Sequence, residues 1–256
     1  ALEREWCQVT YLDADSSGRI TAQAVAEALT PKTQLVSLMH VNNETGAVND
    51  ITAIGALCAE RGVLFHVDAA QSAGKLPLDV HAQHIALLSL SGHKLYAPKG
   101  IGALYVRRLP KVRLEPLLTG GGQEQGLRSG TQAVHQIVAL GAACAIARRE
   151  QHAESERIAV LREWLWQGLA SIADAHRNTP RQGCAPGILS VSFPGITAQA
   201  LLADIPQLAL SAGSACTSAQ DEPSHVLLAL GLAPEVARAT LRFSLGRYSN
   251  AADIDH

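Results

Sequence analysis

The first hundred residues alternate short β-rich runs with stretches patterned for helices. The strand candidates between Cys7 and Val106 are QVTYLD, QLVSLMHV, VLFHVDAA, IALLSLS and GALYVRR. Helices are expected between them over 20–29 and 51–62, with a shorter turn over 71–74. Such alternation is typical of an α/β fold with a mainly parallel sheet covered by helices on both faces. Ligands of these sheets bind where strands end, so polar residues there are the first candidates for a site.

A glycine-rich loop, TGGGQEQGLRSGT, closes this half of the chain. We expect a long helical stretch over 132–175, interrupted once near Gln151, then a strand at ILSVSFPG and a helix containing LLAD. The loop SAGSACTSAQDEPS, a short helix at HVLLALGL and a strand at TLRFSLGR complete the order. The sequence therefore predicts a larger domain over 1–152 and a smaller α+β domain over 153–256.

Composition narrows the class of protein. A net charge of −2 gives no electrostatic reason to expect nucleic acid or an anionic membrane as partner, and no apolar run is long enough to cross a bilayer. The five cysteines show no CxxC spacing, which argues against a metal site and a disulfide framework and favours the cytoplasm. The chain does not begin with Met, and ALEREWCQ is typical of the last turns of a helix. We therefore expect a fragment of a longer protein.

Polar side chains follow three of the expected strands at the points where these strands end. Each has an ordinary explanation, because asparagine is common in turns, aspartate often caps a helix and a lone histidine is usually a satisfied polar group. Since the carboxyl ends of parallel strands meet at one edge of a sheet, we expect the whole set to lie close together. Its members are Asn42, Asn43, Asp68, Gln71, Ser91, His93 and Lys94.

This combination of side chains matches the needs of pyridoxal phosphate. The cofactor requires a lysine that binds it as a Schiff base and a carboxylate that keeps its ring nitrogen protonated. Lys94 and Asp68 would take these two parts. Gln71 would reach the phenolic oxygen of the ring, and Ser91 and His93 would bind the phosphate.

The sequence also resembles a known family. HVDAAQSAGKLPLDV and SLSGHKLYAPKGIGALYVRR resemble the cofactor-binding core of the class V aminotransferase group of fold-type I pyridoxal phosphate enzymes. MHVNNETG, GGGQEQGLRSGT, SAGSACTSA and LRFSLGR are similar to segments of the cysteine desulfurases, in particular the housekeeping type that supplies sulfur for iron–sulfur cluster assembly. The resemblance implies an aspartate aminotransferase-like fold, of which 1–152 is the remainder of the large pyridoxal phosphate-binding domain.

The resemblance implies the same five roles at the strand ends and adds three more residues. Asn43 would touch the phenolic oxygen of the cofactor and the carboxylate of the substrate. Arg242, in LRFSLGR, would hold the substrate carboxylate, a task suited to a two-pronged guanidinium. Thr131 would reach the phosphate in a neighbouring subunit, which implies a homodimer.

Cys216 lies among small and hydroxylated residues in SAGSACTSA. A free cysteine is commonly just a small buried hydrophobe, as we expect of Cys144 within GAACAIA, and the residues alone leave both interpretations open. The resemblance implies that Cys216 takes sulfur from L-cysteine as a persulfide while L-alanine is released. It also implies sulfur-acceptor proteins as partners, such as an iron–sulfur cluster scaffold.

The sequence departs from the family pattern at several points. Ala86 stands where aspartate is usual and Gln125 where arginine is usual, and no upstream phosphate-binding turn or ring-stacking histidine is present. Two alternatives therefore stay open beside a desulfurase. One is a related class V enzyme, such as a selenocysteine lyase or an aminotransferase. The other is a catalytically silent fragment that only binds a subunit or a scaffold.

Overall fold

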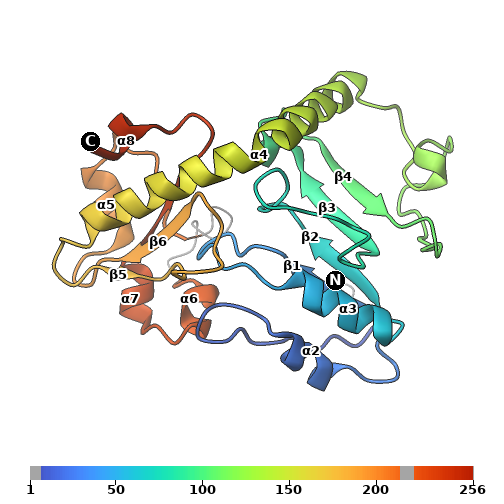
Figure 1. Ribbon diagram of the computed structural model, residues 1–256, viewed down its shortest axis with the longest axis horizontal. Coiled ribbons are helices and arrows are strands. Elements are labelled where there is room, and N and C mark those ends of the chain that lie inside the picture. Colours follow the sequence, from blue (N-terminus) through green and yellow to red (C-terminus); the bar gives the residue numbers. More distant parts are fainter. Residues whose placement is uncertain (1–6, 214–221, 256) are drawn as a thin grey trace.

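The computed structural model describes residues 7–213 and 222–255 and contains two β-sheets joined by one long helix (Figure 1). The first sheet has the order β1-β2-β3-β4. Strands β1, β2 and β3 are parallel, and β4 runs antiparallel to β3. The expected mainly parallel sheet is thus confirmed. Its strands are β1 (Leu35–Met39), β2 (Leu64–Asp68), β3 (Leu87–Ser91) and β4 (Gly102–Val106).

Helices α2 (Ala22–Ala28) and α3 (Ile51–Glu60) pack on the first sheet. Each starts where the sequence supplies a cap, since Thr21 accepts a hydrogen bond from Ala24 N and Asp50 accepts two, from Thr52 N and Ala53 N. Alternate residues of β2 are buried, so the described helices cover one face of this sheet rather than both. The core on that face includes Val25, Ile54, Cys58, Phe65, Val67, Ile85, Leu88, Leu140 and Ala147.

The second sheet is antiparallel, with the order β5-β6-β7. Its core is formed by Leu189, Val191, Leu241 and Phe243, and the apolar side chains packed against them include Leu165, Leu201 and Leu202. Its strands are β5 (His176–Arg177), β6 (Ile188–Ser192) and β7 (Thr240–Ser244). The surrounding helices are α5 (Ala198–Asp204), α6 (His225–Ala229), α7 (Pro234–Arg238) and α8 (Ala251–Asp255).

Helix α4 (Val134–Leu169) runs across both sheets without a break (Figure 1). The interruption expected near Gln151 is wrong, because the run around it contains neither proline nor glycine to end a helix. Leu140 and Ala147 pack in the first core, while Leu165 and Leu169 pack against the second. No helix in the described ranges, α4 included, is both long and apolar enough to span a membrane.

The strand predicted at QVTYLD is also wrong. Residues 8–13 are irregular and Tyr11 is 76% exposed. A β-rich sequence forms a strand only where another strand can pair with it, and no strand of the described chain pairs with this segment.

Candidate active site

The polar residues singled out in the sequence meet at the carboxyl ends of the parallel strands. Asp68 is the last residue of β2 and Ser91 the last residue of β3, while Asn43 follows β1. The strand register places Asp68 level with Met39 on one side and Ser89 on the other. Three neighbouring strands thus end together, as expected of a parallel sheet.

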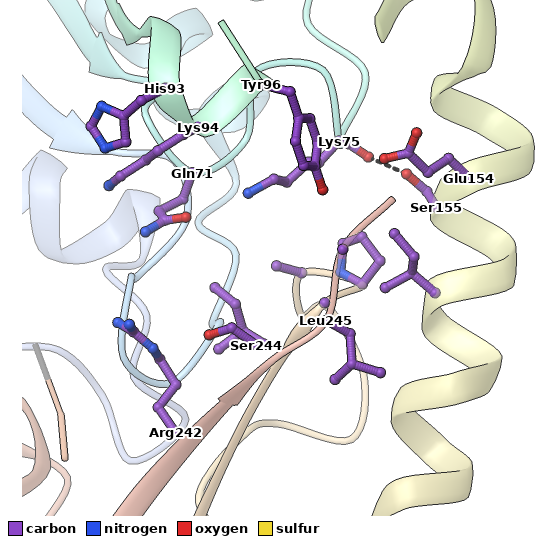
Figure 2. Close-up of a pocket in the computed structure, with 16 residues that line it drawn as sticks. Gln71, Lys75, His93, Lys94, Tyr96, Glu154, Ser155, Arg242, Ser244 and Leu245 are labelled. Atoms are coloured by element: carbon purple, nitrogen blue, oxygen red, sulfur yellow. Dashed lines mark hydrogen bonds between the residues drawn. The ribbon is translucent and has the colours of Figure 1, made fainter. Parts of the chain in front are cut away.

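Lys94 lies in a single 3₁₀ turn, η1 (Gly92–Leu95), directly after β3. A side chain at Gly92 would place its Cβ 2.8 Å from the carbonyl oxygen of Ile101, so only glycine allows this close approach. Leu95 is buried in the first core, and Tyr96 ends the turn in the left-handed region with φ 66°. The backbone under Lys94 is therefore fixed from both sides, and its side chain extends into a pocket (Figure 2).

Hydrogen bonds orient the other polar groups at this sheet edge. The Asp68 carboxylate accepts a hydrogen bond of 2.8 Å from Ala70 N. Ser91 Oγ and His93 Nδ1 lie 3.0 Å apart. On the same face of the sheet as Asp68, His66 contacts hydroxyls of both neighbouring strands. Burial lowers the pKa of His66, and the Asp68 charge partly opposes this shift.

Asn42 and Asn43 have different parts in the turn after β1. Asn42 Oδ1 accepts hydrogen bonds of 2.9 Å from Glu44 N and Thr45 N, so Asn42 shapes the turn, as asparagine commonly does. The carbonyl oxygen of Asn43 accepts a hydrogen bond of 2.8 Å from Arg242 Nη1. This contact joins the edge of the first sheet to β7 of the second.

Arg242 is half-buried, and burial lowers its pKa while the charge of Glu44 opposes this. Its Nε is buried and has no hydrogen-bond partner within the described chain. A desolvated guanidinium with an unused N–H is suited to a carboxylate ligand.

Figure 2 shows one pocket into which Gln71, His93, Lys94 and Arg242 project. It has a volume of about 310 Å³. Asn43, Asp68, Ser91 and Thr131 are not among its lining residues, and Thr131 is exposed in the loop between β4 and α4. Cys216 lies outside the residues that the structure describes.

The pocket also contains residues to which the sequence analysis gave no role. Lys75 projects into it from the turn after β2, beside Tyr96 and Glu154 (Figure 2). Burial lowers the pKa of Lys75, and the nearby charge of Lys94 lowers it further. No pattern in the sequence marks Lys75, and the turn that carries it packs closely on the core because Gly74 before it has φ +70°.

A second cluster closes the pocket between the two sheets. Arg247 Nε donates a hydrogen bond of 2.7 Å to Glu154 Oε2, and Arg247 N donates one of 2.7 Å to the Tyr96 hydroxyl. The guanidinium carbon of Arg247 lies 4.5 Å from the centre of the Tyr96 ring. The hydrogen bond and the charge of Glu154 raise the pKa of Arg247, although burial opposes them.

The cysteines of the described residues differ in environment. Cys58 is buried, and burial raises its pKa to about 11, so it is an unreactive core residue. Cys144 is exposed on α4, and the expectation that it is buried is wrong. GAACAIA places small residues on all sides of the helix, so its letters do not show which side faces the core. The core side carries Ala143 and Ala147.

Comparison with known proteins agrees with this arrangement. The profile of the class-V aminotransferases matches residues 1–256. The chain belongs to this family.

Curated class-V relatives with high similarity carry the name cysteine desulfurase IscS. The chain is 51% identical over 255 residues to the protein of Shewanella sp. strain ANA-3 and 52% identical to that of Shewanella oneidensis. Both alignments cover 100% of this chain and 63% of the relative. The chain therefore spans less than two thirds of the length of these curated relatives.

Solved structures show the same fold. A NifS-like protein matches with a TM-score of 0.90 and 33% identity, over 99% of this chain and 67% of that one. A structure described as SspA in complex with cysteine matches with a TM-score of 0.81 and 41% identity, over 97% of this chain and 69% of that one. These likenesses confirm the fold class expected for pyridoxal phosphate enzymes of fold type I.

Proposed function

We propose that this chain is part of a pyridoxal phosphate-dependent cysteine desulfurase. The observation that carries the proposal is the single pocket shared by Lys94, Gln71, His93 and Arg242 at the ends of parallel strands (Figure 2). An amine, an amide, an imidazole and a guanidinium thus face one space. The similarity to proteins named cysteine desulfurase supports the same conclusion.

Lys94, Gln71 and His93, which line the pocket, have the chemistry that the cofactor needs, and Asp68 and Ser91 end the two neighbouring strands. Pyridoxal phosphate would supply an electron sink that weakens bonds at the α-carbon of a bound amino acid. Lys94 would hold it, Asp68 would keep its ring nitrogen protonated and Gln71 would contact the phenolic oxygen. Ser91 and His93, already 3.0 Å apart, would hold the phosphate.

The substrate would be bound through its carboxylate. Arg242 would offer its Nε–H, which has no partner in the described ranges, and Asn43, whose carbonyl oxygen accepts from Nη1, would fix the guanidinium. The free amine of Lys94 would then take the proton from the substrate α-carbon, acting as a general base.

Sulfur would leave the substrate through Cys216. Its thiolate would attack the sulfur of L-cysteine, forming a sulfur–sulfur bond as the carbon–sulfur bond breaks. The electron pair of that bond would remain on the β-carbon, which takes up a proton. The balance is L-cysteine and a Cys216 thiol giving L-alanine and a Cys216 persulfide, with no external oxidant or reductant.

The remaining features of the proposal concern the whole protein. It would act in the cytoplasm as a homodimer in which Thr131 reaches the phosphate bound by the other subunit. The large domain over 1–152 would hold the cofactor, and the smaller domain over 153–256 would carry Cys216. Persulfide sulfur would pass to acceptor proteins such as an iron–sulfur cluster scaffold.

The test is the sulfur balance with L-cysteine as the substrate. The protein supplied with pyridoxal phosphate should form L-alanine and a persulfide, and Cys216→Ala should form neither. Cys144→Ala, which removes an exposed cysteine, is the matched control and should form both. Alanine formation that survives Cys216→Ala would instead indicate a related lyase, and conversion of L-cysteine to its 2-oxo acid would indicate an aminotransferase. Failure to take up the cofactor would favour a silent, scaffold-binding role.

A further inference from the structure

Glu44 is a buried carboxylate that the proposed reaction does not use. It is 3% exposed, in the turn after β1 and next to Asn43. Glu44 Oε2 accepts a hydrogen bond of 2.5 Å from Ser224 Oγ, the N-cap of α6. Gly213, with φ +75°, lies on another side of the carboxylate, so close that a Cβ added there would be 3.3 Å from Oε2. The Glu44 carboxylate, at the edge of the first sheet, is thus held by residues from the C-terminal half of the chain.

Arg242 is a cation on which the charge of Glu44 acts, yet the two do not pair. None of the ion pairs among described residues joins Glu44 to Arg242. Even so, the charge of Glu44 acts on the guanidinium and partly opposes the effect of burial on its pKa. Arg242 Nη1 donates to the Asn43 carbonyl oxygen, while Nε has no partner in the part of the chain that the structure describes. The carboxylate therefore balances the charge from a distance and leaves the guanidinium open.

We propose that Ser224 is a positioning residue that, by holding Glu44, keeps Arg242 available to a substrate carboxylate. The Ser224 hydroxyl holds the Glu44 carboxylate away from the guanidinium, whose buried charge that carboxylate balances. This inference rests on the proposed function, because it takes Arg242 as the group that binds the substrate carboxylate.

The argument depends on the cost of an unpaired buried carboxylate. Without the Ser224 hydroxyl, the Glu44 carboxylate loses the hydrogen bond that the described residues give it, and a buried charge without a partner is strongly unfavourable. The Nε–H of Arg242 in β7, which has no partner among the described residues, is the replacement for that hydrogen bond. An ion pair formed there would occupy the guanidinium, and a substrate carboxylate would have to displace it.

The experiment compares Ser224→Ala, Glu44→Gln and the double variant. The readout is the preference for L-cysteine over cysteamine, which lacks the carboxylate, as the ratio of apparent affinities. We expect Ser224→Ala to reduce this preference about tenfold, the loss of one good charge-assisted contact. The double variant should recover most of it, because the uncharged glutamine side chain cannot form the competing ion pair. Thr197→Ala, which removes the hydroxyl cap of α5, is the matched control and should not change the preference.

A second readout needs neither cofactor nor substrate. The ¹H–¹⁵N signal of Arg242 Nε, assigned by its loss in Arg242→Lys, should shift in Ser224→Ala and return in the double variant. If Ser224→Ala leaves this signal unchanged, or if the double variant is as impaired as Ser224→Ala, the inference is wrong. The signal could behave as expected while neither the unmodified protein nor any variant prefers L-cysteine over cysteamine. That result would contradict the proposed role of Arg242 in binding the substrate carboxylate, but not the role of Ser224 in holding Glu44.

Discussion

Two lysines reach the pocket from two separate turns, and each turn depends on a glycine. Gly92 precedes Lys94 in the turn after β3, and Gly74 precedes Lys75 in the turn after β2. The sequence allowed Lys94 to be predicted, because it directly follows a strand within a characteristic run of residues. It gave no basis for placing Lys75 beside it, since nothing in linear spacing shows that two turns face each other.

At this scale, His40 makes the stability of the protein depend on pH. Burial lowers its pKa from 6.5 to about 4, and its Nδ1 has no hydrogen-bond partner in the described ranges. The unfolded chain therefore binds a proton below about pH 6.5, while the folded protein resists protonation until about pH 4. As the pH is lowered from 6.5 to 4, the free energy of unfolding should therefore fall by up to about 3 kcal/mol.

Denaturant titrations at several pH values test this prediction. His40→Gln should flatten the pH dependence between pH 6.5 and 4, because the substituted side chain does not titrate. His81→Gln, at an exposed histidine, should leave the dependence as it is. Equal slopes for His40→Gln and the unmodified protein would contradict the assignment.

Among elements, the strands of the first sheet were predicted well because their β-rich runs have paired neighbours. Four of the five expected runs there became strands, and the one at 8–13 did not. The sequence predicted roughly where helix α4 begins and ends, but not that it is unbroken. An interruption was expected near Gln151, whereas the helix continues there and the Gln151 side chain donates a hydrogen bond of 2.6 Å to the Leu76 carbonyl oxygen.

The packing of the turn that carries Lys75 can be tested by adding one methyl group at Gly74. A Cβ at Gly74 would lie 2.5 Å from Leu95 Cδ2 and 2.9 Å from Ala147 Cβ, at a φ of +70°. We expect Gly74→Ala to lower the free energy of unfolding by roughly 2–3 kcal/mol, from overpacking and backbone strain together.

The matched control is Gly62→Ala, with a φ of +67° and no atom within 4 Å of the added Cβ. Gly62→Ala tests the backbone strain of a positive φ without any steric overlap, and it should lower the free energy of unfolding by about 1 kcal/mol. Equal losses in the two variants, measured by urea titration, would show that the close approach to Leu95 and Ala147 contributes nothing.

In the whole molecule, the pocket exists because two sheets are held against each other. Asn43 and Arg242 meet across them, as do Tyr96 and Arg247. Spacing in the sequence could not predict these pairs, because a large part of the chain separates their members. The place of Arg242 near the site was expected only from the family resemblance, and Arg247 was not expected at all.

The ion pair between Glu154 and Arg247 makes a prediction at this scale. Both side chains are mostly buried, at 13% and 15% exposure, and lie 2.7 Å apart. Glu154→Gln leaves Arg247 without its charge partner, so we expect the free energy of unfolding to fall by about 2–3 kcal/mol.

Glu150→Gln removes a carboxylate one turn away that pairs with Arg149 at the surface. It is the matched control, and its denaturation midpoint should not change measurably, because water screens exposed ion pairs. A midpoint for Glu154→Gln as high as that of Glu150→Gln would mean that this pair does not help to join the sheets.

The account depends most on Lys94 as the amine that binds pyridoxal phosphate. The direct measurement is borohydride reduction of the protein with the cofactor, followed by digestion and mass mapping of the modified lysine. The account predicts one pyridoxyl group on Lys94, unchanged in the exposed-lysine control Lys99→Ala and absent from Lys94→Ala. A label found on Lys75, or spread over surface lysines with Lys94 unmodified, would contradict it.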